Sequence, residues 1–343
     1  MNATEDSRIV RNPDGTEFHG RVIEAARPPG PLALELEQCV PGLIAAGGPR
    51  AVRAYVEFFV SRIRNPNTRA AYARACGRFL DWCGALGLTL SDLEPIVVAS
   101  YIEAHPGAAP TVKQHLAAIR MLFDWLVLAQ VLPSNPAAPV RGPKHVVKKG
   151  KTPVLTAGEA RALLDAIDTS HVVGLRDRAL IGVMVYSFAR VGALVAMRVE
   201  DYRIVGRRAS FRLHEKGGKE HEVPAHHNAE AYVDAYLQAA GIREATGTPL
   251  WRSVAGRTRT LTEHALGRRD VLRMVGRRAR DAGISGALSC HTFRATGITA
   301  YLENGGTLEH AQAIAGHESP RTTKLYDRTN DQITLDEIER ILI

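Results

Sequence analysis

The sequence predicts a mainly α-helical (α+β) protein with a small antiparallel β-sheet, built from two domains. Three observations support this fold class. Apolar residues recur at the spacing of an α-helix in both halves of the chain. A two-residue period appears after Tyr202, on either side of Gly217-Gly218. A proline-rich, basic stretch separates the two halves, and a length of 343 residues corresponds to about two domains at roughly 100–200 residues each.

The N-terminal half predicts an extension followed by a helical bundle. Residues 1–47 carry clustered prolines and glycines with weak periodicity, so we expect an N-terminal extension of unknown role with a short helix near Leu32–Cys39. Residues 48–135 predict a bundle of four or five helices. Its strongest helices are expected from Asn67, as N-cap, to Leu86 and from Thr111 to Leu128, with weaker ones at 50–63 and 91–104.

Residues 136–153 predict a basic, proline-rich linker between the domains. Proline and charge both oppose a packed element, and the lysines of this segment are Lys144, Lys148, Lys149 and Lys151. Such a segment suits either a strap across a phosphate backbone or a solvated hinge.

Residues 154–343 predict the second domain. A capping box formed by Thr156 and Glu159 begins its first helix. A buried helix is expected around Leu175–Tyr186. Residues 209–215 and 219–225 flank Gly217-Gly218 and predict a tight antiparallel hairpin. Further helices are expected near 228–239, 264–282 and 292–304.

The charge balance predicts a polyanionic partner. The formal net charge is +8 at pH 7 and the isoelectric point is about 9.5. Residues 1–150 and residues 151–343 each contribute +4. The excess is therefore not one basic tail, and both halves can contact the same polyanion.

Composition and motifs disfavour several other classes of protein. No stretch approaches the ~18 uninterrupted apolar residues of a membrane helix, and the polar N-terminus shows no signal peptide, so no membrane partner is expected. Neither a Walker A loop nor GxGxxG after a strand occurs, which argues against ATP and dinucleotides. The four cysteines lack the spacing of a disulfide framework or zinc site, which fits a reducing cytoplasm: Cys39, Cys76, Cys83 and Cys290.

Two features of the second half could bind a phosphate group. His291 and Arg294 are three residues apart at the expected start of a helix, so they share a face and can point at one anion. By itself this spacing is common in ordinary surface pairs. Arg190 is a single charge inside an apolar helical stretch, which fits either phosphate binding or a structural salt bridge.

A third feature runs from Gly316-His317 to Tyr326. Ser319 is expected to cap a short helix that has Pro320 at its first position. This helix places Tyr326 about two turns beyond the loop of His317. In isolation, the same residues fit a turn histidine and a half-buried tyrosine in ordinary packing.

In their order and spacing these segments resemble the catalytic domain of the tyrosine recombinases, the phage-integrase family. The matching pieces are Ala189-Arg190-Val191, Glu215-Lys216-Gly217-Gly218-Lys219, His291-Thr292-Phe293-Arg294 and Ala315-Gly316-His317 through to Tyr326. The N-terminal half resembles the helical, SAM-like core-binding domain of the same family, through Asn67-Thr68-Arg69 with Tyr72, Phe79 and Trp82. The resemblance covers residues 50–343.

The resemblance implies phosphoryl transfer on DNA without a metal, ATP or any other cofactor. Tyr326 would attack the scissile phosphate and form a 3′-phosphotyrosyl bond. Arg190 and Arg294 would hold the non-bridging oxygens. Lys216 would protonate the leaving 5′ oxygen, with Lys219 as the second choice, and His291 and His317 would assist proton movement.

Four positions in three segments depart from the usual pattern of the family. Ala295 follows the arginine of His-x-x-Arg where histidine is frequent, and Ala315 precedes Gly-His where leucine is frequent. Gly192-Ala193 replaces a frequent Ser-Glu pair after Arg190. None of these changes removes a catalytic group, but they place the chain in a divergent branch of the family.

The resemblance also implies that both domains clamp a DNA duplex. Candidate DNA contacts are Thr68, Arg69, Lys113, Arg120, Lys148, Lys149 and Arg277. The alternative is a solvated helix face for the arginines and a solvated hinge for the two linker lysines. In the tail, Thr334 and Glu337 form a capping box before an apolar stripe at residues 335–342. This final helix either packs on its own domain or docks on a neighbouring protomer, in a tetramer around two duplexes.

Together these observations predict a cytoplasmic site-specific tyrosine recombinase, an integrase of a mobile element. A type IB topoisomerase shares the chemistry, but the core-binding domain and the apolar tail disfavour it. A non-catalytic DNA-binding protein on the same fold is disfavoured by the intact catalytic set: Arg190, Lys216, His291, Arg294, His317 and Tyr326.

Overall fold

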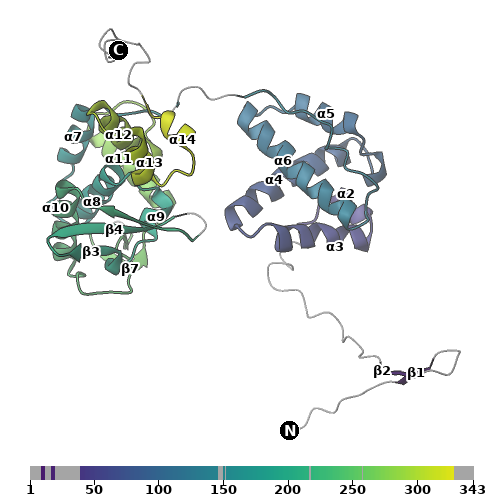
Figure 1. The fold of residues 1–343 in the computed structure, drawn as a ribbon, viewed down its shortest axis with the longest axis horizontal. Helices are drawn as coiled ribbons and strands as arrows, with labels where there is room; N and C mark the ends of the chain where they lie inside the picture. The colour runs from purple at the N-terminus through teal and green to yellow at the C-terminus, as the bar shows by residue number, and fades with distance from the viewer. Residues whose placement is uncertain are drawn as a thin grey trace, which may run out of the picture. The chain divides into compact units, whose positions relative to one another are not determined.

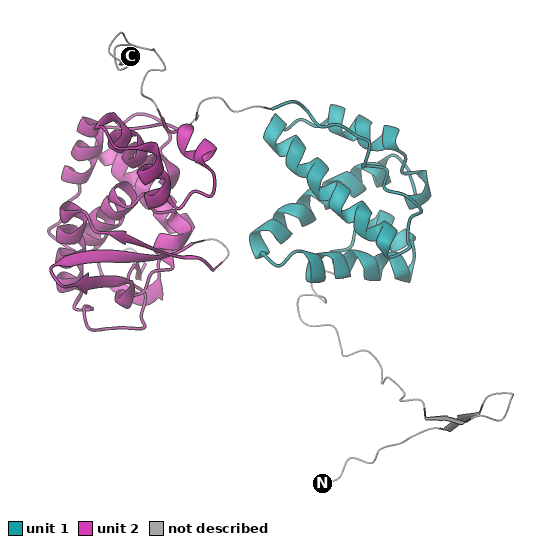
Figure 2. Ribbon diagram, viewed as in Figure 1, with its two compact units in different colours: residues 1–146 teal, residues 147–343 magenta. Residues whose placement is uncertain are grey.

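The computed structural model describes residues 9–11, 17–19, 39–145, 150, 152–215, 218–256 and 258–327. The chain divides into two compact units, Met1–Val146 and Val147–Ile343, each with its own hydrophobic core (Figures 1 and 2). The division falls inside the predicted linker. Both units are mainly helical, and the described strands form small antiparallel sheets. The predicted fold class is therefore confirmed.

The first unit is a helical bundle preceded by a strand pair. β1 (Ile9–Arg11) and β2 (Glu17–His19) pair antiparallel, which the prediction for the extension did not include. The helix expected at Leu32–Cys39 falls almost wholly outside the described residues. The bundle consists of α2 (Gly42–Ala46), α3 (Pro49–Glu57), the π-helical turn η1 (Phe58–Arg62), α4 (Pro66–Ala85), the 3-10 turn η2 (Leu90–Asp92), α5 (Pro95–Glu103) and α6 (Ala109–Leu128).

Aromatic packing joins the helices of this bundle. Phe79 of α4 contacts Tyr101 of α5 and Phe123 of α6 edge to face, with ring centroids 5.1 and 5.9 Å apart. The prediction placed the N-cap of α4 too late. Asn65 is the cap, because its Oδ1 accepts hydrogen bonds from the backbone N–H groups of Asn67 and Thr68 and Pro66 suits the first helical position.

The second unit is organised around α8, which is buried along most of its length. Its helices are α7 (Ala157–Asp165), α8 (Val172–Tyr186), α9 (Val191–Val195), the 3-10 turn η3 (Val199–Asp201), α10 (His227–Ala240), α11 (Arg268–Asp281), α12 (Cys290–Glu303), α13 (Leu308–Ala315) and α14 (Pro320–Lys324). Its strands are β3 (Tyr202–Val205), β4 (Arg208–His214), β5 (Glu220–Pro224), β6 (Arg252–Val254) and β7 (Leu261–Ala265). Helices α7, α10 and α12 all pack against α8, which explains its mainly apolar surface.

A buried ion-pair network ties α8 to α11. Asp177 is fully buried and accepts hydrogen bonds from Arg176 (Nη2, 2.6 Å) and Arg278 (Nη2, 2.8 Å). Arg176 also donates to the carbonyl of Arg252 at 2.7 Å. Buried charges are tolerated here because each one is paired with an opposite charge and hydrogen-bonded to it. The helix that contains Arg277 is thus fixed to the core.

The predicted hairpin is present as β4–β5. These strands pair antiparallel, with Phe211 opposite Val223, and β3 pairs on the other side of β4. At the end of the hairpin, the N–H of Glu215 donates to the carbonyl of Lys219 at 2.8 Å. Lys216 and Gly217 lie outside the described residues.

The strand pair β6–β7 was not predicted. Its residues overlap the helix expected at 264–282, which begins only at Arg268 as α11. Arg252 pairs with Ala265, and the N–H of Leu266 donates to the carbonyl of Trp251 at 2.8 Å. Such a short strand is stabilised by its pairing partner more than by its own residue pattern.

None of the described helices combines the length and apolarity that crossing a membrane requires.

Candidate active site

Five of the six predicted catalytic residues converge in the second unit. Arg190 lies at the junction of α8 and α9, His291 and Arg294 lie in the first turns of α12, His317 follows α13, and Tyr326 follows α14. The positive charges of Arg190 and Arg294 act on both histidines, and Tyr326 interacts with Arg294. The sixth residue, Lys216, lies outside the described residues, directly after Glu215.

Arg294 is the most deeply held of these side chains. It is 1% exposed and donates from Nη1 to the carbonyl of Phe188 and from Nη2 to the carbonyl of Ala315 at 2.6 Å. Burial lowers its pKa to about 10, and the charge of Arg190 acts in the same direction, while Tyr326 and Glu215 oppose the shift. The guanidinium is therefore still cationic at neutral pH and fixed by backbone acceptors.

The backbone at Phe188 is adapted to this contact. Its φ of +53° lies in the left-handed region, which a bulky residue other than glycine rarely adopts and which carries strain of order 1–3 kcal/mol. Phe188 is buried against Ile298 and Leu302 of α12. Packing thus holds the chain in the conformation that presents the Phe188 carbonyl to Arg294.

Arg190 is held by a carboxylate instead of by backbone carbonyls. It occupies the N-cap position of α9, so it lies at a break between two helices and not inside a helix as the sequence suggested. Its Nη1 donates to Oε2 of Glu215 at 2.5 Å. The side chain of Arg190 is 36% exposed, whereas that of Glu215 is 8% exposed. The arginine therefore forms a salt bridge and also faces solvent.

A left-handed glycine places His317 beside Tyr326. Gly316 has a φ of +57° and ends α13, after which the N–H of His317 donates to the carbonyl of Gln312 at 3.1 Å. The His317 ring stacks on the ring of Tyr326, with centroids 5.8 Å apart and planes at 9°. Its Nδ1 lies 2.9 Å from Oγ1 of Thr323.

Both histidines of the site favour the neutral form. Burial, together with the charges of Arg294, Arg190 and His291, lowers the pKa of His317 to about 4. The pKa of His291 is also lowered, first by partial burial of its ring and then by Arg294 and Arg190. At neutral pH both rings can therefore accept or relay a proton.

Tyr326 is held by its backbone and by the ring of His317. Its N–H donates to the carbonyl of Thr323 at 2.9 Å, and its carbonyl accepts from Oγ1 of Thr299 at 3.0 Å. Its side chain is partly exposed and packs on the small cluster that contains Phe188. The carbonyl of Leu325, just before it, accepts from the N–H of Gly150 at 3.0 Å, so the linker reaches this segment.

An open cleft of about 760 Å³ adjoins these residues. It is lined by Arg190, Glu215, Lys219, Glu220, His221, Gly316, His317, Glu318, Ser319 and Thr322. Lys219, the second choice for the general acid, forms an exposed ion pair with Glu318 at 2.8 Å. No group of three or more potential metal ligands occurs in the described part of the chain.

Sequence reasoning missed three residues that shape the site: Phe188, Glu215 and Thr323. Glu215 is adjacent to Lys216, and this position could have drawn attention to it. Phe188 acts through its carbonyl and Thr323 through one hydroxyl. Neither carries a signal in the sequence, because any residue supplies a carbonyl and threonine is common in short helices.

The predicted DNA contacts differ in their surroundings. Lys113 and Arg277 are exposed and Thr68 is partly exposed. Arg69 donates to the carbonyls of Phe59 and Ile63, and Arg120 donates to those of Ala137 and Val140, so both arginines also stabilise loops of the bundle. Lys148 and Lys149 lie outside the described residues.

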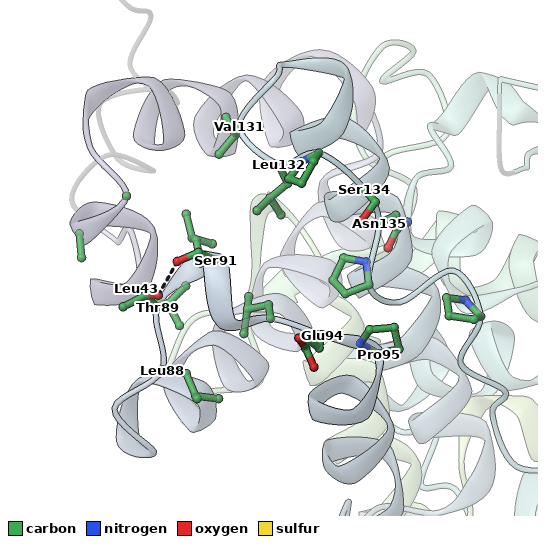
Figure 3. Close-up of a pocket in the computed structure, with 17 residues that line it drawn as sticks. Leu43, Leu88, Thr89, Ser91, Glu94, Pro95, Val131, Leu132, Ser134 and Asn135 are labelled. Carbon is green, nitrogen blue, oxygen red and sulfur yellow. Dashed lines mark hydrogen bonds between the residues drawn. The ribbon is translucent and has the colours of Figure 1, made fainter.

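The first unit contains a different kind of pocket (Figure 3). It has a volume of about 770 Å³ and lies among α2, η2 and the segment after α6. Leu43, Leu88, Val131 and Leu132 line it together with several prolines, and Glu94 is its one ionisable lining residue. Because it lacks a cluster of titratable groups, the site with Arg190 and Arg294 is the better candidate for chemistry.

Comparisons with known proteins point to one family. Residues 153–332 match the model of the phage integrase family. The chain is 30% identical over 284 residues to tyrosine recombinase XerC of Pelobacter propionicus, covering 81% of this chain and 89% of that protein. It is 27% identical over 274 residues to tyrosine recombinase XerD of Listeria monocytogenes, covering 78% and 89%.

Solved structures share the fold. XerH bound to palindromic difH substrate superposes with a TM-score of 0.62 at 18% identity, over 77% of each chain. A lambda integrase dimer bound to a COC′ core site gives a TM-score of 0.62 at 19% identity, over 95% of each chain. A helical N-terminal domain followed by this catalytic domain defines the class of DNA strand-transferring tyrosine recombinases. The chain belongs to the phage integrase family, whose model covers more than half of it.

Proposed function

We propose that this recombinase cuts and rejoins specific DNA sites through a covalent 3′-phosphotyrosyl intermediate formed by Tyr326. The observation that carries the proposal is the stacking of Tyr326 on His317, beside an arginine that two backbone carbonyls hold in place. A phenol, two guanidinium groups and two neutral imidazoles together provide a nucleophile, oxyanion stabilisation and proton acceptors.

The proposed first step exchanges one phosphodiester bond for another. The Tyr326 oxygen attacks the phosphorus, its proton passes to a neutral histidine or to water, and the bond from phosphorus to the 5′ oxygen breaks. Arg190 and Arg294 offset the charge on the non-bridging oxygens. The phosphotyrosyl bond conserves the energy of the broken bond, so a 5′ hydroxyl can reverse the step without ATP or a metal.

Lys216 is proposed as the general acid that protonates the departing 5′ oxygen. This role follows from the family resemblance and from its place on the β4–β5 hairpin, next to Glu215. Lys219 remains the second choice for the general acid. Its ammonium forms an ion pair with the exposed Glu318. Because exposed ion pairs contribute little stability and separate readily, this pair does not exclude Lys219 from the role.

Double-stranded DNA and further copies of the chain are the proposed partners. The net charge of +8 is divided between both halves, which suits a clamp on a phosphate backbone. A lambda integrase tetramer bound to a Holliday junction has the same fold, with a TM-score of 0.61. We propose that the present chain likewise assembles as a tetramer. The proposal also includes exchange of the C-terminal helix between protomers, action on a mobile element and a cytoplasmic location.

Tyr326→Phe tests the proposed chemistry. The phenylalanine ring can still stack on His317 but has no oxygen to attack phosphorus. We expect the variant to form no covalent protein–DNA adduct, while its DNA affinity stays within about twofold of the wild type. Adducts are measured by denaturing gel on duplexes that the wild-type protein selects from a random pool. An adduct formed by Tyr326→Phe would rule out this nucleophile.

A topoisomerase activity on the same fold is distinguished by plasmid relaxation. A site-specific recombinase should leave a supercoiled plasmid without its target unchanged, whereas a type IB topoisomerase should relax it. Wild-type protein that forms no adduct on any selected duplex would favour the non-catalytic DNA-binding alternative.

A further inference from the structure

Glu215 is the carboxylate that pairs with an arginine of the candidate site. Its Oε2 accepts from Nη1 of Arg190 at 2.5 Å, and the side chain is only 8% exposed. Its negative charge also raises the pKa of Arg294. A carboxylate buried this far is stable only with its cation in place, so the pair holds both side chains in one arrangement.

The backbone of Glu215 closes the hairpin that carries the proposed general acid. Its N–H donates to the carbonyl of Lys219 at 2.8 Å, just beyond the last β4–β5 pair, His214 with Glu220. Lys216 is the next residue, and consecutive α-carbons lie about 3.8 Å apart. Glu215 therefore links Arg190, through its side chain, to the base of the hairpin, through its backbone.

A second buried acid fixes the strand that leads into Glu215. Asp201 is fully buried and accepts from Nε of Arg212 at 2.6 Å, and it lies 3.1 Å from Nε2 of His214. Its Oδ2 also accepts from the N–H of Arg198 at 2.8 Å. The end of β4 is thus attached to the core immediately before Glu215, which makes this residue a rigid support.

We propose that Glu215 is a positioning residue that couples the phosphate-binding Arg190 to the hairpin of Lys216. This inference rests on the proposed function. The contact uses one N–H of Arg190, whose guanidinium has five, so donors remain for a phosphate. A carboxylate beside the phosphate site weakens binding of DNA in the ground state, but it holds Arg190 and the base of the hairpin in place before reaction.

The coupling predicts opposite effects on binding and on cleavage. Glu215→Gln keeps the length of the side chain but removes its charge. We expect it to bind the selected duplex at least as tightly as the wild type and to form the phosphotyrosyl adduct roughly tenfold or more slowly. Glu215→Asp keeps the charge but is one methylene shorter, so we expect slower adduct formation without tighter binding.

Single-turnover adduct formation and equilibrium binding are measured on one duplex selected by the wild-type protein. Glu222→Gln is the matched control, because Glu222 lies on β5 of the same hairpin and bonds to Ser210 at 2.6 Å, not to Arg190. The control should match the wild type in both measurements. Weaker binding together with slower cleavage in Glu215→Gln would indicate a merely structural role and overturn the inference, as would an unchanged or faster rate.

A duplex with sulfur at the bridging 5′ position isolates the hairpin. A thiolate leaves without protonation, so a defect that acts through the general acid should shrink on this substrate. A defect of equal size on the oxygen and sulfur duplexes would overturn the coupling to Lys216. Failure of the wild type to form any adduct would instead overturn the proposed function itself.

Discussion

The two arginines of the site are held in different ways, and the difference bears on the proposed catalysis. Arg294 donates hydrogen bonds to the backbone carbonyls of Phe188 and Ala315. These acceptors are fixed because they belong to the folded backbone. Arg190 is bound by one carboxylate at the edge of an open cleft. The first arginine is thus positioned before DNA arrives by backbone groups of the fold itself. The second is held by Glu215 through one of its five N–H groups, so it keeps donors for a phosphate.

The titration of His317 predicts a loss of stability in mild acid. Its pKa falls from an ordinary value of 6.5 to about 4 in the folded protein, so the unfolded chain binds the proton first as the pH falls. The free energy of unfolding should therefore decrease between pH 7 and pH 5, by about 1–2 kcal/mol from this group. His317→Gln should remove that part of the loss.

Urea unfolding at pH 7 and pH 5 measures this difference. His310→Gln is the control, because His310 lies exposed on the neighbouring helix α13. The control should keep the pH dependence of the wild type. A His317→Gln variant with the same acid sensitivity as the wild type would contradict the assignment of this loss to His317.

At the scale of elements, the C-terminal end of the linker contacts the segment of Tyr326 in the second unit. Gly150 donates its N–H to the carbonyl of Leu325, the residue before Tyr326. A Cβ at position 150 would lie 2.4 Å from that carbonyl oxygen, which is closer than atoms in contact can approach. The segments of Gly150 and Leu325 therefore meet through backbone atoms, and this contact requires glycine at position 150.

Gly150→Ala should displace the segment that carries Tyr326. Because the clash is with a backbone atom, it cannot be relieved by a side-chain rotation. We expect adduct formation to slow by about tenfold, since small misplacements of a reacting group are costly, with little change in DNA affinity. The rate of adduct formation is compared with that of Gly142→Ala, where a Cβ would meet side-chain atoms alone, of Leu116 at 3.2 Å and of Lys113 at 3.7 Å. Equal rates for Gly150→Ala and the wild type would show that the contact does not position Tyr326.

At the scale of the whole molecule, the proposed function requires both units to contact one polyanion. Each half of the chain carries a net charge of +4, and each has its own core. Affinity for DNA that comes from phosphate contacts in both units falls steeply with salt. The proposed recombination additionally requires contacts between protomers, for which we propose the apolar stripe of the C-terminal sequence.

Deletion of residues 332–343 separates these two requirements. The deleted stripe contains Leu335, Ile338, Ile341 and Leu342, and it carries none of the predicted DNA contacts. We expect binding to a single site to stay within about twofold of the wild type, and recombination of paired sites to be strongly reduced. Gel shift and a recombination assay measure the two activities. Unchanged recombination would refute exchange of this helix between protomers.

The sequence by itself determined the fold class, most helices and the order of the catalytic set. Helical periodicity, the capping box at Thr156 and the Gly217-Gly218 hairpin are local signals, so they could be interpreted without neighbours. The residues of the site were recognised by order and spacing along the chain. The short pair β6–β7 escaped prediction because its pairing is not encoded in local periodicity.

Only the tertiary structure decided how the site is held together. The ion pair of Arg190 with Glu215 spans 25 residues, and the bond from Arg294 to Phe188 spans 106. The stacking of Tyr326 on His317 depends on the left-handed turn at Gly316 and on α14. Residue types show which groups carry charge or protons. A hydrogen bond to a backbone carbonyl, however, depends on which distant segment packs beside the donor. Core packing decides which segments become neighbours, and no local sequence pattern specifies it.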